Sequence, residues 1–353
     1  MIKLGIFDHM DDSGVPLHDH FANRLKVVEA YDRLGFYCYH VAEHHSTPLG
    51  VAASPGIYLS AVSQRTQQLR FGPLVYLLPF YHPLRLVEEI SMIDQLSGGR
   101  FQLGIGRGVS PFEAAFYNID FKNSREQYHE AYTVVMNGLH SDLINFDGQF
   151  HKFKNVPMLL HPVQLPHPPL WYGLGTPENA VWPAMHDVNV VMLGRRSVIR
   201  DIVARYREVR AELGKTDADL PMIGVSRHVV VADTDHEAME IARRAYPKWL
   251  HSFKWLWERQ GVDVGQMVKT TAGNYPDTFD EIMAVGNAIA GSPETVRQFI
   301  EEEVAATGIN YFVSWLAFGD LTPEETIRSA ELLAEVGRTV RVSGRPDVLA
   351  AAK

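Results

Sequence analysis

Glu43, His44 and His45 stand together at the end of an apolar run, in the segment VAEHHSTPLG (41–50). In an extended strand neighbouring side chains point to opposite faces, so His44 faces away from Glu43 and His45. Adjacent histidines are therefore poor ligands for one metal ion, and the sequence has neither an HExxH motif nor a cysteine pair. An imidazole held beside a carboxylate is a natural general base near pH 7. The segment leaves two interpretations, a catalytic base or a strand-end histidine bonded to backbone.

The glycine-rich segment LGIGRGVSP (103–111) could bind an anion. Its glycines let a ligand approach the backbone, and the guanidinium of Arg107 can bind a phosphate or a carboxylate through two hydrogen bonds. The spacing is not that of the dinucleotide motif GxGxxG, and no helix begins at the position that this motif requires. The alternative is structural, with glycines for close packing and Arg107 in a salt bridge.

A helix start in GLGTPENA (173–180) is a second candidate anion site. Thr176 has the character of an N-cap, and Pro177 suits the first helical position. Unpaired N–H groups at a helix N-terminus attract anions. The same pattern recurs in SPE (292–294) and TPE (322–324), so by itself it indicates only that a helix begins. Its place at a strand end, after two glycines, makes a phosphate a reasonable alternative.

Apolar runs of strand length alternate with segments of helical period along the chain, and we count eight such β-then-α units. Strands that are apolar throughout indicate a parallel sheet covered on both faces. Eight units predict a closed (β/α)8 barrel, with an open doubly wound sheet as the main alternative. In such a barrel the active site lies at the carboxyl ends of the strands, where the candidate residues above are found. The predicted strands are 2–7, 37–44, 69–78, 101–108, 168–175, 188–193, 221–232 and 309–318.

Two segments interrupt this alternation. Residues 141–167 contain a DG turn and many prolines, which predicts an inserted hairpin followed by an irregular arm. Residues 258–291 are rich in Gly, Asp, Thr and Asn and predict a long loop that acts as a lid. We expect a single barrel domain over residues 1–340 and a flexible tail over 341–353.

Composition narrows the class of protein. The chain has 353 residues, of which 46% are hydrophobic, and a formal net charge of −9, which disfavours a nucleic-acid partner. No apolar run is long enough to span a membrane, and the first residues turn acidic too early for a secretory signal. Cys38 is the only cysteine, so no intrachain disulfide is expected, and the cytoplasm is the expected location. The sequence contains neither a P-loop nor a GxSxG motif.

Taken together, these segments resemble the bacterial luciferase-like family of flavin-dependent monooxygenases. The resemblance extends over nearly the whole chain, and DQLSGGRF followed by GxGRG is its most specific part. It implies a (β/α)8 barrel that binds reduced FMN and forms a homodimer. The matching pieces, in family order, are AEHHSTPLG, LPFYHPLRLVEE, DQLSGGRFQLGIGRG, KNSR, GLGTPENAVW and AGSPETVRQFIEEEVAATGI.

The resemblance implies a role for each matching residue. His44 matches the active-site histidine, which assists the formation and use of the flavin peroxide. Arg107 matches an arginine at the FMN phosphate, and Arg125 matches a second arginine on the phosphate side. Two guanidiniums and a helix N-terminus are suitable partners for a phosphate dianion.

Other matching positions correspond to further flavin contacts. Thr176 and Asn179 match polar phosphate contacts, and Gly175 supplies backbone there. Leu74 and Val75 match a strand bulge with a non-proline cis peptide against the isoalloxazine ring. At the position of Gly106 luciferase has a cysteine beside the flavin, so we expect the glycine to leave that spot open.

The reaction that the resemblance implies is a two-component oxygenation. A separate NAD(P)H:flavin reductase supplies FMNH2, because no nicotinamide fingerprint is visible. Oxygen then forms a C4a-peroxyflavin, which oxygenates a small, fairly apolar substrate such as an aldehyde or alkane. Luciferase has an acidic residue at the position of Gly175 and tryptophans where this chain has Leu193 and Gly194, so light emission is not expected.

Two other functions remain open from the sequence. One is a coenzyme F420-dependent dehydrogenase built on the same barrel, although the EHH strand end is closer to the FMN branch of the family. The other is a non-catalytic flavin-binding subunit. The joint presence of His44, Arg107 and Arg125 favours a working site over that second alternative.

Overall fold

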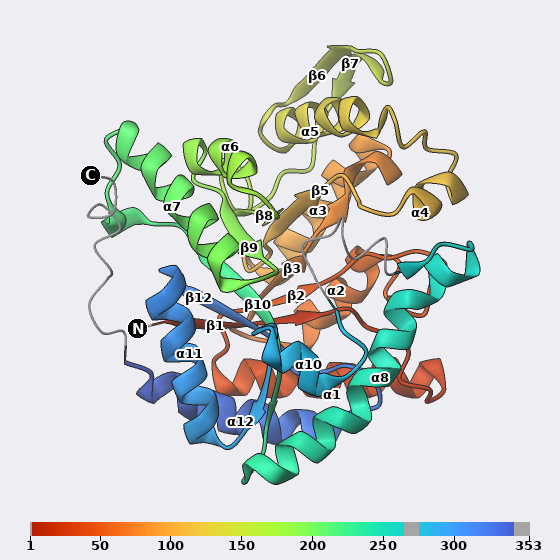
Figure 1. Cartoon of the computed structure of the whole chain (residues 1–353). Coiled ribbons are helices and arrows are strands. Elements are labelled where there is room, and N and C mark those ends of the chain that lie inside the picture. The colour runs from red at the N-terminus through yellow and green to blue at the C-terminus, as the bar shows by residue number, and fades with distance from the viewer. Residues whose placement is uncertain (1, 265–274, 342–353) are drawn as a thin grey trace.

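The apolar runs form a barrel of parallel strands surrounded by helices (Figure 1). The computed structural model describes residues 2–264 and 275–341. Within these residues the eight predicted strands are present, the third being divided into β3 and β4. Their bounds are β1 (Lys3–Asp8), β2 (Cys38–Val41), β3 (Arg70–Pro73), β4 (Tyr76–Leu77), β5 (Leu103–Gly106), β8 (Leu170–Leu174), β9 (Asn189–Met192), β10 (Ile223–Val231) and β12 (Tyr311–Trp315).

Strand pairing closes the sheet on itself. The order runs β3-β2-β1-β12-β10-β9-β8-β5-β4, with every pair parallel. The ring closes because β4 pairs with β5, and Phe71 of β3 also forms a bridge with Phe101 before β5. The predicted (β/α)8 barrel is confirmed, and the open doubly wound sheet is excluded.

The helices begin and end at residues whose types favour those positions. Proline occupies the first turn of α2, α3, α11 and α12, and Gly35, Gly98 and Gly308 adopt the left-handed conformation after α1, α3 and α11. Thr322 and Glu325 form a capping box at the start of α12. No helix of the described residues is long and apolar enough to cross a membrane. The helices are α1 (Leu17–Leu34), α2 (Pro55–Arg65), α3 (Pro83–Ser97), α4 (Pro111–Phe116), α5 (Ser124–His140), α6 (Val181–Met185), α7 (Arg196–Glu212), α8 (Asp235–Arg259), α10 (Phe279–Ala284), α11 (Pro293–Thr307) and α12 (Pro323–Thr339).

The predicted insertion is confirmed as an antiparallel hairpin of β6 (Leu143–Asp147) and β7 (Lys152–Pro157). It stands out from the barrel beside α5 (Figure 1). The carboxylate of Glu130 on α5 accepts hydrogen bonds from the backbone N–H groups of residues 149–151 in the hairpin turn. An irregular arm follows, with a cis peptide bond before Pro166. The insertion therefore rests on the helix that carries Arg125.

The predicted loop over residues 258–291 is shorter than expected. Its first two residues complete α8, and its last part contains α10 and the strand β11 (Ala288–Gly291), which pairs with β10. The sequence AIAG is too short and too rich in small residues to stand out as a strand, but β10 is nine residues long and offers it a free edge. Residues 265–274 and the predicted tail beyond 341 lie outside the described residues.

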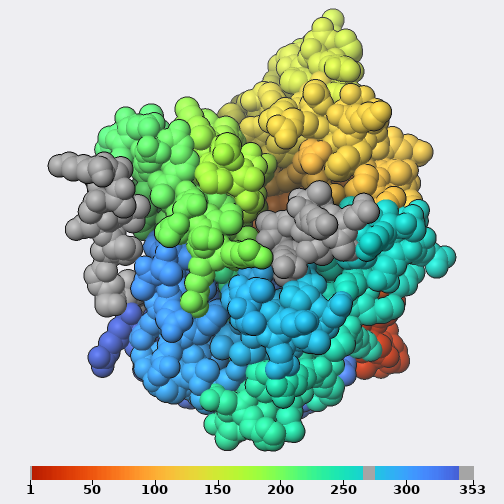
Figure 2. All heavy atoms as spheres, viewed as in Figure 1, coloured from red at the N-terminus to blue at the C-terminus, as the bar shows by residue number. Residues whose placement is uncertain are grey.

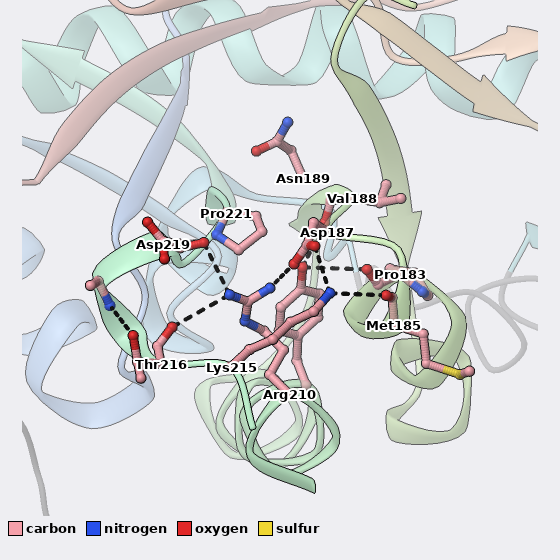
Figure 3. A network of polar contacts seen from close by, with 12 residues as sticks. Pro183, Met185, Asp187, Val188, Asn189, Arg210, Lys215, Thr216, Asp219 and Pro221 are labelled. Atoms are coloured by element: carbon pink, nitrogen blue, oxygen red, sulfur yellow. Dashed lines mark hydrogen bonds and ion pairs between the residues drawn. The ribbon is translucent and has the colours of Figure 1, made fainter. Parts of the chain in front are cut away.

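A polar network at the start of β9 fixes one wall of the barrel. Figure 3 shows the guanidinium of Arg210 between the carboxylate of Asp187 and backbone carbonyl oxygens of the α7–β10 connection. Lys215 Nζ lies 2.6 Å from the Asp187 carboxylate and donates to the carbonyl oxygen of Met185 at 3.1 Å. Arg210 is buried, and the hydrogen bonds of its two terminal nitrogens stabilise this corner. The network positions the end of α6, which lines the cavity described next.

Candidate active site

A cavity of about 830 Å³ opens at the carboxyl ends of the barrel strands. Figure 2 shows the surface hollowed between the green segment that includes α6 and the yellow-orange segment that includes α5. Its floor is apolar and aromatic, with Phe7, Val191 and Trp315 from β1, β9 and β12. Ser226 adds a hydroxyl, which accepts a hydrogen bond from the indole N–H of Trp315. The cavity has the size and mixed lining of a small-molecule site.

The barrel brings most of the predicted site residues to this one cavity. They come from segments far apart in the sequence, which meet because the carboxyl ends of parallel strands share one end of the barrel. Seven of the nine line the cavity: His44, Leu74, Val75, Gly106, Arg107, Arg125 and Asn179. Gly175 and Thr176 are not among the described residues that line it.

Thr176 stands at the predicted N-cap position, but it does not cap an α-helix. Pro177 does begin a helical turn, but it is the short 3-10 turn η2 (Pro177–Ala180), and the Thr176 side chain makes no capping hydrogen bond. Thr176 instead bonds to the carboxyl group of Glu178, and this hydrogen bond lowers the pKa of Glu178. Because the carboxylate of Glu178 also lines the cavity, this segment attracts an anion less strongly than the sequence suggested.

The side chain of His44 lies in the cavity wall and contacts Glu113. Its Nδ1 atom is 3.3 Å from Oε1 of Glu113, and the His44 side chain is 19% exposed. Gly50 packs so closely that a Cβ atom there would lie 2.9 Å from the Cβ of His44. The ring of His9 is 5.7 Å from the ring of His44. His44 is thus positioned by contacts, with one face toward the cavity.

Glu43 and His45 form a separate, structural pair, as side-chain alternation predicted. Oε1 of Glu43 is 2.8 Å from Nε2 of His45, and Oε2 accepts hydrogen bonds from Leu77 N at 3.1 Å and Tyr81 Oη at 2.9 Å. Burial raises the pKa of the Glu43 carboxyl, while His45 and these donors oppose the rise. The pair ties the end of β2 to β4 and the turn that follows it.

Two arginines bring positive charge to the other side of the cavity. Arg107 follows β5 and donates to Ser124 Oγ at 3.2 Å, and its guanidinium lies 4.6 Å from the ring centre of Phe121. Arg125 is the second residue of α5. No carboxylate of the described residues pairs with either arginine, so the salt bridge considered for Arg107 is not found there. Both guanidiniums are available to an anion.

The interruption between β3 and β4 faces the cavity beside β5. The peptide bond between Leu74 and Val75 is cis, as the family resemblance implied, and both residues line the cavity. The expectation that Gly106 leaves an open spot is wrong. A Cβ atom at Gly106 would lie 2.4 Å from Cγ2 of Val75, so the valine already fills that space.

The sequence did not indicate Glu113 as a site residue, and it predicted no functional role for His9, His228 or Trp249. Glu113 is on α4, where Ser110 accepts a hydrogen bond from its backbone N–H. The S-x-x-E pattern after the LGIGRG strand indicates a helix that starts at a strand end. This pattern is the feature of the sequence that could have pointed to Glu113. Burial lowers the pKa values of His9 and His228, and both rings contact Trp249 behind the cavity floor.

Comparison with known proteins yields relatives that cover almost the whole chain. A sequence model of the family described as luciferase-like monooxygenase matches residues 2–311. The uncharacterized protein y4wF of Sinorhizobium fredii is 38% identical over 341 residues, covering 95% of this chain and 98% of the relative. The oxygenase component of a flavin-dependent trigonelline monooxygenase from Acinetobacter baylyi is 23% identical, covering 90% of each chain.

Solved structures share the same fold. The oxygenating constituent of 3,6-diketocamphane monooxygenase from Pseudomonas putida, a type II Baeyer–Villiger enzyme in complex with FMN, aligns with a TM-score of 0.80. It is 23% identical and covers 97% of this chain and 99% of its own. The coenzyme F420-dependent tetrahydromethanopterin reductase of Methanopyrus kandleri aligns with a TM-score of 0.70 at 18% identity, covering 96% and 99%. At these identities the likeness establishes the fold alone.

Proposed function

This chain belongs to the luciferase-like monooxygenase family, and from that premise we propose that it uses reduced FMN and O2 to oxygenate a small, fairly apolar organic substrate. The observation that carries the proposal is the shared cavity of His44, Arg107 and Arg125. A general base on one side of the cavity, and on the other side two guanidiniums without a carboxylate partner among the described residues, suit a redox cofactor that ends in a phosphate.

The residues present fit FMN. Arg107, Arg125 and Ser124 would hold its phosphate, and Asn179 would add a polar contact. Leu74 and Val75 would lie against the ring system, in a stretch of wall that is otherwise apolar. When bound, reduced FMN supplies the electrons that activate O2. The negatively charged Glu178 on the same wall opposes the phosphate, so the arginines contribute most of the attraction.

His44 is the proposed base and hydrogen-bond partner at the reacting centre. Its ring reaches the cavity from the end of β2. The floor beside it is built from aromatic and aliphatic side chains, including Phe7 and Trp315, which exclude water. Among the described residues, this floor of apolar side chains favours an uncharged, apolar substrate such as an aldehyde or alkane.

The proposed system has two components. A relative of this chain is the oxygenase component of its enzyme, and this sequence has no nicotinamide fingerprint. A separate NAD(P)H:flavin reductase would therefore supply reduced FMN. The cytoplasm is the proposed location, because the single cysteine, Cys38, gives no sign of an oxidising compartment.

A homodimer is the proposed assembly. The face formed by α2, α3 and the arm after β7 exposes large apolar side chains, with Ile57 76%, Met92 52%, Leu96 52% and Leu159 91% exposed. A groove of about 500 Å³ runs between these segments. Contiguous exposed apolar surface of this kind marks an interaction site, and a second copy would cover it.

A coenzyme F420-dependent dehydrogenase is the alternative, since an enzyme using that coenzyme shares the fold. Equilibrium binding separates the two. We expect the chain to bind FMN at least about tenfold more tightly than F420. Tighter binding of F420 would favour the alternative. A chain that binds FMN tightly yet never consumes O2 with any reductant would be the non-catalytic flavin-binding subunit instead.

A further inference from the structure

The carboxylate of Glu113 joins α4 to the histidines at the end of β2. Ser110 and Pro111 begin α4, and an acidic residue in the first turn is favoured by the positive end of the helix. Oε1 lies 3.3 Å from His44 Nδ1, and Oε2 accepts the backbone N–H of His45 at 2.8 Å. The helix therefore presents one carboxylate to two neighbouring residues.

Glu113 is ionised in this setting. Its side chain is 5% exposed, and burial alone would raise the pKa of the carboxyl. The electrostatic interaction with His44, the hydrogen bond from its ring, the His45 amide and the His45 ring together outweigh burial and hold the pKa of Glu113 below its usual range. An ionised carboxylate can only accept, so the His44 nitrogen facing it must carry a proton.

We propose that Glu113 is a positioning residue, which holds His44 with its proton on Nδ1 and leaves the lone pair of Nε2 free toward the cavity. The inference rests on the proposed function for the use of that lone pair, as the base and acceptor at the reacting centre. Glu113 then determines the orientation of the His44 ring and its tautomer, because both are set by the hydrogen bond at Nδ1.

The surroundings of His44 support one defined arrangement. Nδ1 has a partner in the described part of the chain, whereas Nε2 has none there. Gly50 and the ring of His9 prevent the imidazole from retreating behind the cavity wall. A merely structural role for Glu113 is the competing explanation, because its second oxygen also fixes the His45 backbone. The two explanations differ in what they predict for the His44 tautomer.

Glu113→Gln separates them. The amide oxygen can still accept the N–H of His45, so the structural bond is kept. The amide nitrogen, however, is a donor and would face His44 Nδ1, which must then become the acceptor. We expect the proton to move from Nδ1 to Nε2 in this variant. Tyr117→Phe is the matched control on the next turn, because it removes the hydroxyl that contacts His45 Nδ1 and leaves Glu113 intact.

The readout is the ¹⁵N spectrum of the flavin-free protein labelled at its 16 histidines, with the His44 signals identified from a His44→Gln variant. Wild type and Tyr117→Phe should show protonated Nδ1, and Glu113→Gln should show protonated Nε2. The same tautomer in wild type and Glu113→Gln overturns the proposal. So does a wild type with the proton on Nε2.

A second readout connects the tautomer to the chemistry. With reduced FMN and O2 and no organic substrate, all the consumed O2 ends as H2O2, so the measured quantity is the rate at which H2O2 appears. In Glu113→Gln this rate should be roughly tenfold that of wild type. The Kd of the variant for FMN should stay within about twofold of wild type, because Glu113 is not among the proposed phosphate partners. An unchanged rate of H2O2 release despite an altered tautomer contradicts the positioning role. If wild type binds no FMN, the proposed function fails, while the tautomer result still decides the inference.

Discussion

Nδ1 of His44 lies 3.3 Å from Oε1 of Glu113, across 69 positions of the sequence. The bond links the loop after β2 to the helix after β5, so the candidate base is held by a different β/α unit from its own. Such cross-unit contacts arise at the carboxyl ends of barrel strands, where loops from all units meet. They also make the base sensitive to changes in α4, far from it in sequence.

Loss of either cavity arginine should weaken FMN binding through the phosphate. We expect Arg107→Ala and Arg125→Ala each to raise the Kd for FMN by roughly tenfold to a hundredfold, because each removes a charge-assisted contact. Flavin fluorescence measures this directly. Riboflavin, which lacks the phosphate, is the control, and its Kd should change by less than about twofold. Equal losses for FMN and riboflavin would show that the arginines do not contact the phosphate.

His44→Gln should shorten the delay between O2 uptake and H2O2 release. The glutamine keeps a polar side chain but cannot act as a base, so we expect O2 uptake with reduced FMN to continue and H2O2 to appear faster than with wild type. FMN affinity should remain near the wild-type value. The measurement is the rate of H2O2 appearance after the reduced flavin is mixed with O2, and a rate equal to that of wild type would remove His44 from the chemistry.

Crowding at Gly106 should be reversible by a second change. Gly106→Ala places a methyl group 2.4 Å from Cγ2 of Val75, and a β-branched side chain has little freedom to move. We expect roughly tenfold weaker FMN binding, because Val75 is displaced into the cavity. The double variant Gly106→Ala/Val75→Ala should recover most of the loss. Additive losses in the double variant would contradict this contact.

The sequence predicted the barrel well because its evidence is local and repeated. Each strand is an apolar run and each helix has its own start, as in the Pro83 turn of α3 and the capping box of Thr322. Closure needs no further information, since eight parallel units leave few alternatives. The strand β11 escaped notice because a run of four residues, three of them small, depends on pairing with β10 rather than on its own pattern.

Residue type predicted the candidate site only at His44 and Arg107, which are distinctive residues at strand ends. Arg125, Leu74, Val75 and Asn179 were predicted from the family resemblance, and all six residues line the cavity. Glu113 has an ordinary helix-start pattern, and its contact with His44 depends on how α4 is placed. The space beside Gly106 was also misjudged, because the neighbour that fills it belongs to another strand. Contacts between units are set by tertiary packing, which one sequence does not reveal.

Stability should depend on pH through Asp11, which is fully buried after β1. Burial raises its pKa to about 7, although Arg24 and the backbone N–H of Gly319 oppose the rise. As pH increases from about 4 to 7, the carboxyl ionises in the unfolded state before it does in the folded state, so the folded state loses stability. Asp11→Asn should therefore gain about 2–3 kcal/mol relative to wild type between pH 5 and pH 8, measured by urea unfolding. A difference that does not change with pH would contradict the raised pKa.

The apolar face on α2 and α3 should determine the oligomeric state. Met92→Asp introduces a charge into the proposed interface, where Met92 is 52% exposed, and should convert a dimer to a monomer at micromolar concentration. Leu213→Asp is the control, because Leu213 is equally exposed, at 50%, but lies at the end of α7. Analytical ultracentrifugation distinguishes the two. A wild type that is already monomeric would contradict the proposed dimer. A dimer unaffected by Met92→Asp would show that the interface lies elsewhere.

A crystal structure of the chain with FMN tests the central claim most directly. The account predicts the phosphate within hydrogen-bond distance of both Arg107 and Arg125, the ring system against Leu74 and Val75, and Nε2 of His44 facing the flavin. It would be contradicted by FMN bound in this cavity with its phosphate away from both arginines, or by a cavity that stays empty at saturating FMN.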